Sequence, residues 1–134
     1  MDYTDILTRE EQRGVISSLL SLTSNDRIRW KQGSRDDVFT IDLGEHTYIL
    51  QSRDRDGLLP YRIEIFIINR PQDAKKLAEI ITRGPDDEDY DDYITRSMKE
   101  IFTIAYRFTH RSESEVESLL SELDKIDRGD LPPF

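Results

Sequence analysis

The side chains best suited to acid–base chemistry near neutral pH are the two histidines of this sequence, His46 and His110. His46 follows a turn signal at Gly44-Glu45, and His110 lies near the end of an expected helix. A hydrolase would need one of them beside a nucleophile and an orienting carboxylate, and the chain has neither a Gly-x-Ser-x-Gly segment nor a cysteine. We therefore predict structural histidines, no enzymatic activity, no metal site and no cofactor.

A second candidate is the acidic segment at residues 86–92, which reads DDEDYDD. It holds six of the 28 acidic residues, so the remaining 22 are nearly balanced by 19 lysines and arginines. Clustered oxygens can bind Ca²⁺, but this segment lacks the alternating ligands and central glycine of a calcium loop. We expect a solvated connector whose carboxylates favour the N-terminus of the next helix. The alternative is a docking segment for a basic partner, with contacts at Asp87, Asp89, Tyr90 and Tyr93.

A third group consists of basic residues around one tryptophan: Arg27, Arg29, Trp30, Lys31, Arg35, Arg53, Arg55 and Arg62. Basic side chains with an interleaved aromatic ring can hold a nucleic-acid backbone and stack a base. Aspartates are interspersed among them, and Trp30 is expected to face the core with Ile28. Because the net charge is also −9, nucleic acid is not an expected partner.

Length and composition restrict the class of protein that can hold these residues. The chain has 134 residues, of which 36% are hydrophobic and none is cysteine, which suits one domain over residues 1–134. Its start, MDYTD, lacks the basic and apolar stretches of a secretion signal, and no apolar run reaches the length of a membrane span. We expect a soluble, cytoplasmic protein with no membrane contact.

The first half of the chain predicts a helix followed by antiparallel strands. Thr8 and Glu11 fit a capping box before an apolar stripe, so a helix is expected over residues 9–22. A short strand is expected over 27–31, followed by a hairpin over 38–51 with a two-residue turn. The expected register places three pairs of residues on one face: Leu43 with His46, Ile41 with Tyr48, and Phe39 with Leu50.

The last expected strand covers residues 61–68. In a simple meander it lies at the edge of the sheet, where its apolar Phe66 and Ile68 need a cover. A helix is expected to begin at Pro71, to carry a stripe of Ala74, Leu77, Ile80 and Ile81, and to end at Gly84-Pro85.

Two further helices are expected after the acidic segment. The first carries a stripe of Ile94, Met98, Ile101, Ala105 and Phe108, widened by Phe102. The second follows a capping box at residues 112–115 and buries Val116, Leu119, Leu120, Leu123 and Ile126. We expect the two to form an antiparallel hairpin, with a flexible tail over residues 128–134.

The expected fold class is therefore α+β: an N-terminal helix, a three- to four-stranded antiparallel meander, and three helices ending in a helical hairpin. The order of elements resembles that of small bacterial proteins of unknown role. The stretches that carry this resemblance are residues 28–31, 37–48, 61–63 and 101–123. They are patterns of apolar and turn residues, so the resemblance implies no activity.

These observations predict a non-catalytic protein-binding module with an inhibitor, immunity or chaperone-like role. Its expected contacts are Phe66 and Ile68 on the last strand, Asp87, Asp89 and Tyr90 in the acidic segment, and Tyr93 directly after it. The partner is a protein of unknown identity, and a second copy of the chain is one candidate. The alternative function is an acidic mimic of nucleic acid that blocks a DNA- or RNA-binding protein.

Overall fold

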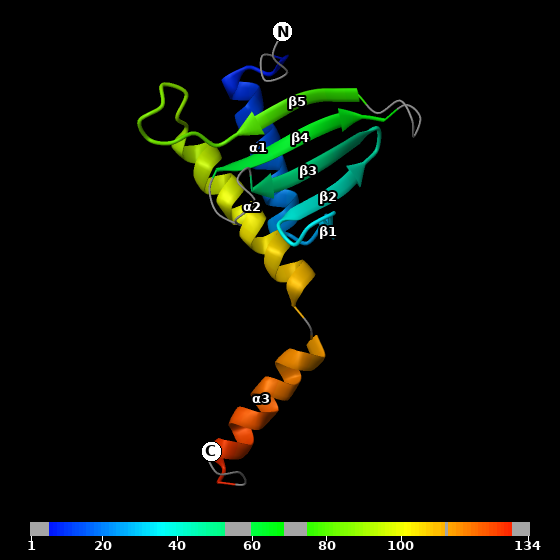
Figure 1. Ribbon diagram of the computed structural model, residues 1–134, viewed down its shortest axis with the longest axis vertical. Helices are drawn as coiled ribbons and strands as arrows, with labels where there is room; N and C mark the ends of the chain where they lie inside the picture. Colours follow the sequence, from blue (N-terminus) through cyan, green and yellow to red (C-terminus); the bar gives the residue numbers. More distant parts are fainter. Residues whose placement is uncertain (1–5, 53–59, 69–74, 112, 130–134) are drawn as a thin grey trace.

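The computed structural model describes residues 6–52, 60–68, 75–111 and 113–129. The elements in chain order are α1 (Arg9–Ser24), β1 (Lys31–Gln32), β2 (Val38–Leu43), β3 (His46–Ser52), β4 (Tyr61–Ile67), β5 (Lys75–Ile81), α2 (Asp92–His110) and α3 (Glu113–Asp127). The strands form one antiparallel sheet in the order β1-β2-β3-β4-β5. Helices α1 and α2 pack against each other, while α3 projects away from the sheet (Figure 1). The architecture is α+β, as the sequence predicted.

The N-terminal helix begins where the capping box predicts. The Thr8 side chain accepts a hydrogen bond from the Glu11 backbone N–H at 3.1 Å, and the Glu11 carboxylate accepts one from the Thr8 N–H at 2.9 Å. Ile16 and Leu19 face the core, being at most 3% exposed. The helix extends two residues beyond the expected end, to Ser24.

The central hairpin has the predicted register. Leu43 pairs with His46, Ile41 with Tyr48 and Phe39 with Leu50. Phe39 and Leu50 are fully buried and Ile41 nearly so, which confirms that this face of the hairpin contacts the core. The expected strand over 27–31 is shorter and later, because only Lys31 and Gln32 pair with β2.

Gly44 makes the hairpin turn possible because its φ of 62° lies in the left-handed region. Replacing Gly44 with alanine is expected to lower the free energy of unfolding by about 1–2 kcal/mol, the cost of holding an L-residue in that region. No heavy atom lies within 4 Å of the added Cβ, so the loss is conformational and not steric. Urea unfolding measures it, and an unchanged midpoint would contradict this account of the turn.

Gly14 supplies the matched control for that substitution. It lies inside α1, and a Cβ added there also meets no atom within 4 Å. Gly14→Ala is therefore expected to raise the free energy of unfolding by about 0.5–1 kcal/mol, because alanine has the higher helix propensity and restricts the unfolded chain.

The helix expected after residue 71 is wrong: the described part of this segment, Lys75–Ile81, is strand β5. Its apolar residues satisfy both periods, but alternate residues Ala78 and Ile80 are buried and pair with Ile65 and Ile63 of β4. This segment adopts a strand and not a helix because β4 would otherwise leave its backbone N–H and C=O groups unpaired at an apolar edge. Residues 69–74, including Pro71 and Ala74, lie outside the described residues.

The position of β4 corrects a second prediction. It is an inner strand and not an edge, because β3 and β5 pair with its two sides. Phe66 is half-buried opposite Thr47 and Lys76. Ile68, just after the strand, is 37% exposed, and its N–H donates to the Glu45 carbonyl at 3.0 Å. β5 therefore occupies the strand edge that was expected to need a cover, while Ile68 stays partly exposed.

The core lies between the sheet and the pair α1 and α2. Its fully buried members come from the sheet and from both helices: Ile16, Phe39, Leu50, Ile63, Ile80, Met98 and Ile101. In α2, five of the six predicted stripe residues, Ile94, Met98, Ile101, Phe102 and Ala105, are buried as expected, but Phe108 is 47% exposed. The sheet, α1 and α2 together, which we call the body, thus have a continuous core without any contribution from α3.

The predicted helical hairpin is wrong. α3 does not fold back on α2 but continues away from the body (Figure 1), and none of its described side chains is buried. The C-cap of α2, Arg111, has an extended backbone (φ −81°, ψ 128°) that begins this course. Ser112, part of the expected second capping box, and residues 130–134 of the expected tail lie outside the described residues.

Among the described helices, none is long and apolar enough to cross a membrane.

Candidate functional site

The two histidines have aromatic and apolar surroundings. His46 begins β3 and pairs with Leu43 on β2 and Ile67 on β4. The His110 ring stacks on Tyr106, with 3.9 Å between the ring centroids, and its Nδ1 lies 3.0 Å from the Tyr106 carbonyl oxygen. No hydrogen bond or ion pair within the described part of the chain joins either imidazole to a carboxylate. Within the described residues, the partners of the His110 ring are thus the Thr109 hydroxyl, the Tyr106 carbonyl and neighbouring aromatic rings.

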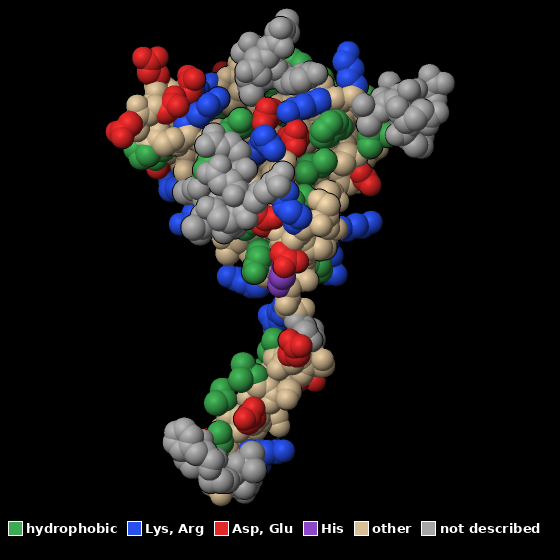
Figure 2. Space-filling view, viewed as in Figure 1, with side chains coloured by type: hydrophobic (Ala, Val, Ile, Leu, Met, Phe, Trp, Pro, Cys, Tyr) green, Lys and Arg blue, Asp and Glu red, His purple; other side chains and the backbone are tan. Residues whose placement is uncertain are grey.

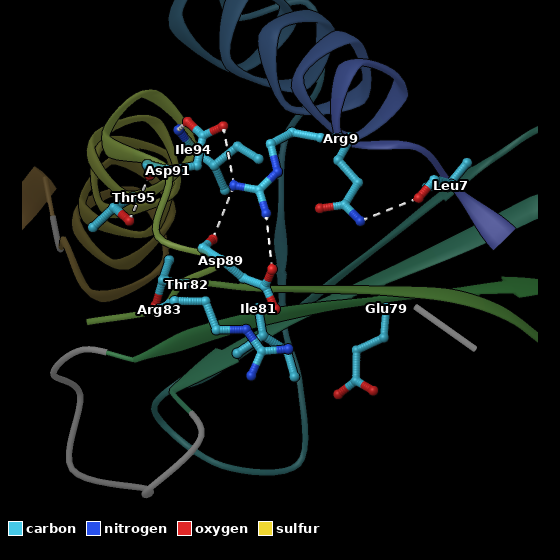
Figure 3. Close-up of a pocket in the computed structure, with 11 residues that line it drawn as sticks. Leu7, Arg9, Glu79, Ile81, Thr82, Arg83, Asp89, Asp91, Ile94 and Thr95 are labelled. Carbon is cyan, nitrogen blue, oxygen red and sulfur yellow. Dashed lines mark hydrogen bonds and ion pairs between the residues drawn. The ribbon is translucent and has the colours of Figure 1, made fainter. Parts of the chain in front are cut away.

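A polar cavity of about 350 Å³ lies where the start of α1, the end of β5 and the start of α2 meet (Figure 3). Arg9 reaches into it from α1. Its guanidinium lies 3.3 Å from the Asp89 carboxylate, 3.0 Å from the Asp89 carbonyl and 3.9 Å from the Asp91 carboxylate. Arg83, Glu79 and Thr82 line it from β5 and the residues that follow (Figure 3). The cavity is thus the junction at which α1 binds the acidic segment.

Asp91 is the centre of this junction. It is only 6% exposed, and its Oδ1 accepts the Ile94 N–H at 3.0 Å, so it is the N-cap of α2. Its Oδ2 lies 2.6 Å from Arg13 Nε. Desolvation acts to raise the pKa of Asp91, but the hydrogen bond from Ile94 and the charges of Arg13 and Arg9 outweigh it and lower the pKa below its usual value. A general base near neutral pH needs the opposite shift, so Asp91 acts as a structural anion.

The acidic segment is therefore only partly the solvated connector that we expected. Asp89 and Asp91 bind arginines of α1, about eighty residues earlier in the chain, and no sequence signal near either partner indicated this. Asp87 is exposed and accepts the Asp89 N–H at 2.8 Å. The Tyr90 hydroxyl donates to Asp92 at 2.7 Å, which raises the pKa of that phenol, and Tyr93 is 38% exposed.

A second cavity, of about 620 Å³, lies beside the C-terminal half of α2. We call it the aromatic groove, and it is lined by Tyr61, Phe102, Thr103, Tyr106, Arg107, His110 and Arg111. Its wall is a ladder of stacked rings, with centroids 4.4 Å apart between Tyr61 and Phe102 and 6.3 Å apart between Phe102 and Tyr106. Rings on α2 recur every four residues, which places them on one face of the helix. The sequence carried that spacing, but the contribution of Tyr61 from β4 could not be read from it.

The groove rests on the core through Phe39. This fully buried ring makes edge-on contacts with Phe102 (5.3 Å), Tyr106 (6.3 Å) and His110 (6.4 Å) between centroids. Buried rings in such a geometry hold each other in fixed positions. The outer rings, Tyr106 and His110, are exposed to solvent. The groove is consequently a preformed aromatic surface with arginines at its rim.

The third feature is the apolar stripe of α3, which consists of Val116, Leu119, Leu120, Leu123 and Ile126. The three leucines are 55%, 60% and 54% exposed, which makes them the most exposed large apolar side chains among the described residues. The other sides of the helix are polar, with six carboxylates and one lysine between Glu113 and Asp127. In Figure 2 the hydrophobic side chains form a row along one side of α3. The residues are those predicted for a buried helix, but no described part of the chain buries the three leucines, and Val116 and Ile126 are half-buried.

Among the described members of the basic group around Trp30, the tryptophan is not open for stacking; Arg53 and Arg55 of that group lie outside the described residues. Trp30 is 2% exposed, as expected, and its Nε1–H donates to the Thr23 hydroxyl at 3.0 Å. Arg29 pairs with Asp26 at 2.8 Å, and its guanidinium lies 5.0 Å from the centroid of the Phe108 ring. The tryptophan is thus unavailable for base stacking in this conformation.

Within the described ranges, no three histidine, aspartate or glutamate side chains come together as a metal site would require. Comparison of the chain with protein-family models, with curated proteins and with solved structures gives no match. The functional argument therefore depends on the geometry of the aromatic groove, the polar junction and the stripe of α3.

Proposed function

We propose that this protein is a non-catalytic protein-binding module whose binding element is the apolar stripe of α3. The observation that carries the proposal is the exposure of Leu119, Leu120 and Leu123, each more than half exposed on a helix that projects from the body. Contiguous exposed apolar surface of this kind marks interaction sites in monomeric proteins. An amphipathic helix docking in a hydrophobic groove is a common recognition mode, with anchors three and four residues apart.

The stability of α3 supports this role. A 15-residue helix alone in water is at the length where helices are only marginally stable, so packing must supply most of its stability. Complete burial of one leucine side chain contributes about 1.5–3 kcal/mol relative to exposure. The core of the body does not include these leucines. We infer that they are buried against the surface of another protein.

The body suits a presenting role. Its core is continuous through the sheet, α1 and α2, and ion pairs at Asp91 fix the start of α2. α3 therefore projects from the end of α2, a helix whose start is held in place by these ion pairs. Inhibitor, immunity and chaperone-like roles are all compatible with such a surface, and each remains within the proposal.

The acidic mimic of nucleic acid has less support. A mimic needs carboxylates that are free to replace phosphates across one surface. Asp89 and Asp91 are engaged by Arg9 and Arg13, and Glu64 and Glu79 on the open face of the sheet are engaged by Lys76. We therefore keep protein binding as the proposed function.

The test replaces two stripe leucines in the full chain, Leu119→Glu with Leu123→Glu. We expect binding to its protein partner to weaken roughly a hundredfold or more, because two buried leucines contribute about 3–6 kcal/mol and each 1.4 kcal/mol is tenfold. Two copies of the chain with different affinity tags would be expressed together in cells that make the protein naturally, and one tag would be used for purification. The purified material then shows whether the protein retained in stoichiometric amount is the other tagged copy or a different protein.

The matched control is Ser118→Glu with Ser121→Glu, which adds the same charge to exposed positions on the other sides of α3. This variant is expected to keep the partner, and thermal unfolding of the body is expected to be the same in both variants. Equal retention by the leucine variant would contradict the proposed binding element.

A further inference from the structure

We infer that a second binding site of this protein lies around Arg83 and takes a small carboxylic acid that carries an apolar group. The carboxylate pairs with the Arg83 guanidinium, and the apolar group occupies a cavity beside it. This inference goes beyond the proposed function, because the site lies at the start of α2, at the opposite end of that helix from α3 (Figure 1).

Two cavities meet at Arg83. One is the polar cavity of about 350 Å³ at the junction of α1, β5 and α2. The other is a cavity of about 590 Å³ beside the segment that follows β5, and we call it the apolar cavity. Both are lined by Thr82, Arg83 and Thr95, so they share one wall. Cavities of roughly 300–1,000 Å³ are the size that holds small organic ligands.

Arg83 supplies the positive charge of the proposed site. It is half-buried, and within the described ranges no hydrogen bond or ion pair joins its guanidinium to another residue. In Figure 3 no dashed line reaches Arg83, whereas dashed lines join Arg9 to Asp89 and Asp91. A partly desolvated guanidinium is stabilised by an acceptor of opposite charge, and a carboxylate can accept two parallel N–H bonds from it.

The other arginines beside the polar cavity already have counterions. Arg9 pairs with Asp89 at 3.3 Å, and Arg13 pairs with Asp91 at 2.6 Å. Two cations therefore balance two carboxylates where α1 meets the acidic segment. These pairs contribute no net charge to the polar cavity.

Glu79 also lines the polar cavity, but it belongs to a balanced network on the sheet. Its carboxylate lies 3.2 Å from Lys76 and 3.4 Å from Arg62, and Lys76 also pairs with Glu64 at 2.9 Å. Two cations again face two carboxylates. The charge left over is that of Arg83, so a ligand with one negative charge neutralises the site, whereas a dianion such as phosphate gives it an excess of negative charge.

The apolar cavity holds the rest of the ligand. Pro60, Pro85 and Tyr90 line it, and their rings offer apolar surface. Asp87 also lines it and repels a second negative charge. The ligand therefore has its anionic group at Arg83 and a neutral, apolar group towards Pro85 and Tyr90.

The test titrates the full-length chain with phenylacetate and follows the backbone amides by two-dimensional NMR. We expect saturable shifts at Arg83, Gly84 and Thr95, with a dissociation constant of about 1 mM or below. Phenylacetamide has the same ring without the charge, and acetate has the charge without the ring. Each is expected to bind about tenfold or more weakly, because each lacks one of the two contacts.

Arg83→Gln is expected to weaken phenylacetate binding about tenfold or more, because the charge-assisted hydrogen bonds are lost. The matched control is Arg27→Gln, which removes the same charge. Arg27 is exposed and lines neither cavity, so binding is expected to change by less than about twofold. Thermal unfolding verifies that both variants are folded.

Four results would overturn the inference. They are an absence of saturable shifts, equal binding of phenylacetamide and phenylacetate, equal binding by Arg83→Gln and wild type, and tighter binding of inorganic phosphate than of phenylacetate. None of them bears on the proposed function, since Leu119→Glu with Leu123→Glu is expected to bind phenylacetate as the wild type does. Loss of the protein partner in that leucine variant would support the proposed function whatever Arg83 binds.

Discussion

Phe39→Ala is expected to lower the free energy of unfolding by about 3–5 kcal/mol, the range for removing a buried phenylalanine ring. The Phe39 side chain is fully buried, and its ring contacts Phe102 at 5.3 Å and Tyr106 at 6.3 Å between centroids. Removal leaves a cavity between the sheet and α2 that neighbouring rings can fill only by leaving the aromatic groove. Urea unfolding followed by circular dichroism measures the loss.

Phe108→Ala is the control for this prediction. Its ring is 47% exposed, and its described polar neighbour is the Arg29 guanidinium at 5.0 Å from its centroid. A cation–π contact at an exposed site contributes about 0.5–1 kcal/mol, so the expected loss is of that size. If the two alanine variants unfolded at the same urea concentration, the position of Phe39 at the centre of the core would be wrong.

Asp91→Ala is expected to lower the free energy of unfolding by about 1–2 kcal/mol. Loss of an N-cap side chain costs about 1 kcal/mol, and here the Oδ1 atom that accepts the Ile94 N–H is removed. The remainder is the loss of the buried carboxylate that holds Arg13 at 2.6 Å. That part is kept small, because the Arg13 side chain is 52% exposed and water replaces much of the attraction.

The same carboxylate predicts a dependence on pH. Its pKa is lower in the folded chain than in the unfolded chain, where aspartate titrates near about 3.9. Its stabilising effect is therefore complete above the unfolded pKa and is lost as the pH falls through the folded pKa. Between about pH 6 and pH 3, wild type should lose more stability than Asp91→Asn, which keeps an acceptor for Ile94 but carries no charge. Parallel curves for the two proteins would contradict the role of the ion pair.

The acidic residues that remain in Asp91→Asn make this comparison specific. Glu11 and Asp26 also have lowered pKa values, from hydrogen bonds with Thr8 and Arg29 respectively. Both carboxylates are present in the wild type and in the variant, so their titration cancels in the difference between the two curves. The difference then reports the charge at position 91 together with its effect on the neighbouring Asp92, whose lowered pKa that charge acts to raise.

The parts of the fold that sequence reasoning predicted are those fixed by neighbours in the chain. The capping box at Thr8 joins residues three apart, and the hairpin register follows from a turn at Gly44 and strict alternation on either side. Strand β5 was missed because Lys75–Ile81 satisfies helical and strand periods alike. Its structure is decided by the open edge of β4, which is a contact between distant segments that no local pattern reveals.

The candidate site was predicted only in part for the same reason. The stripe of Leu119 and Leu123 was recognised as apolar, but a stripe does not say which surface covers it, and the expected hairpin with α2 is absent. Asp89 is one of the expected partner contacts, which stays a prediction, and its ion pair with Arg9 of the same chain was not expected. The aromatic groove needs Tyr61 from β4 beside rings of α2, so it exists only once the sheet is assembled.

The central claim is that the stripe of α3 lies against another protein in the cell. A photo-activated crosslinking amino acid at position 123, in the full-length chain expressed where the protein occurs naturally, tests it most directly. The same residue at position 121, on the polar side of α3, is the control. We predict covalent adducts of one defined mass from position 123 and few from position 121. Equal yields from both positions, or no adduct from position 123, would contradict the claim.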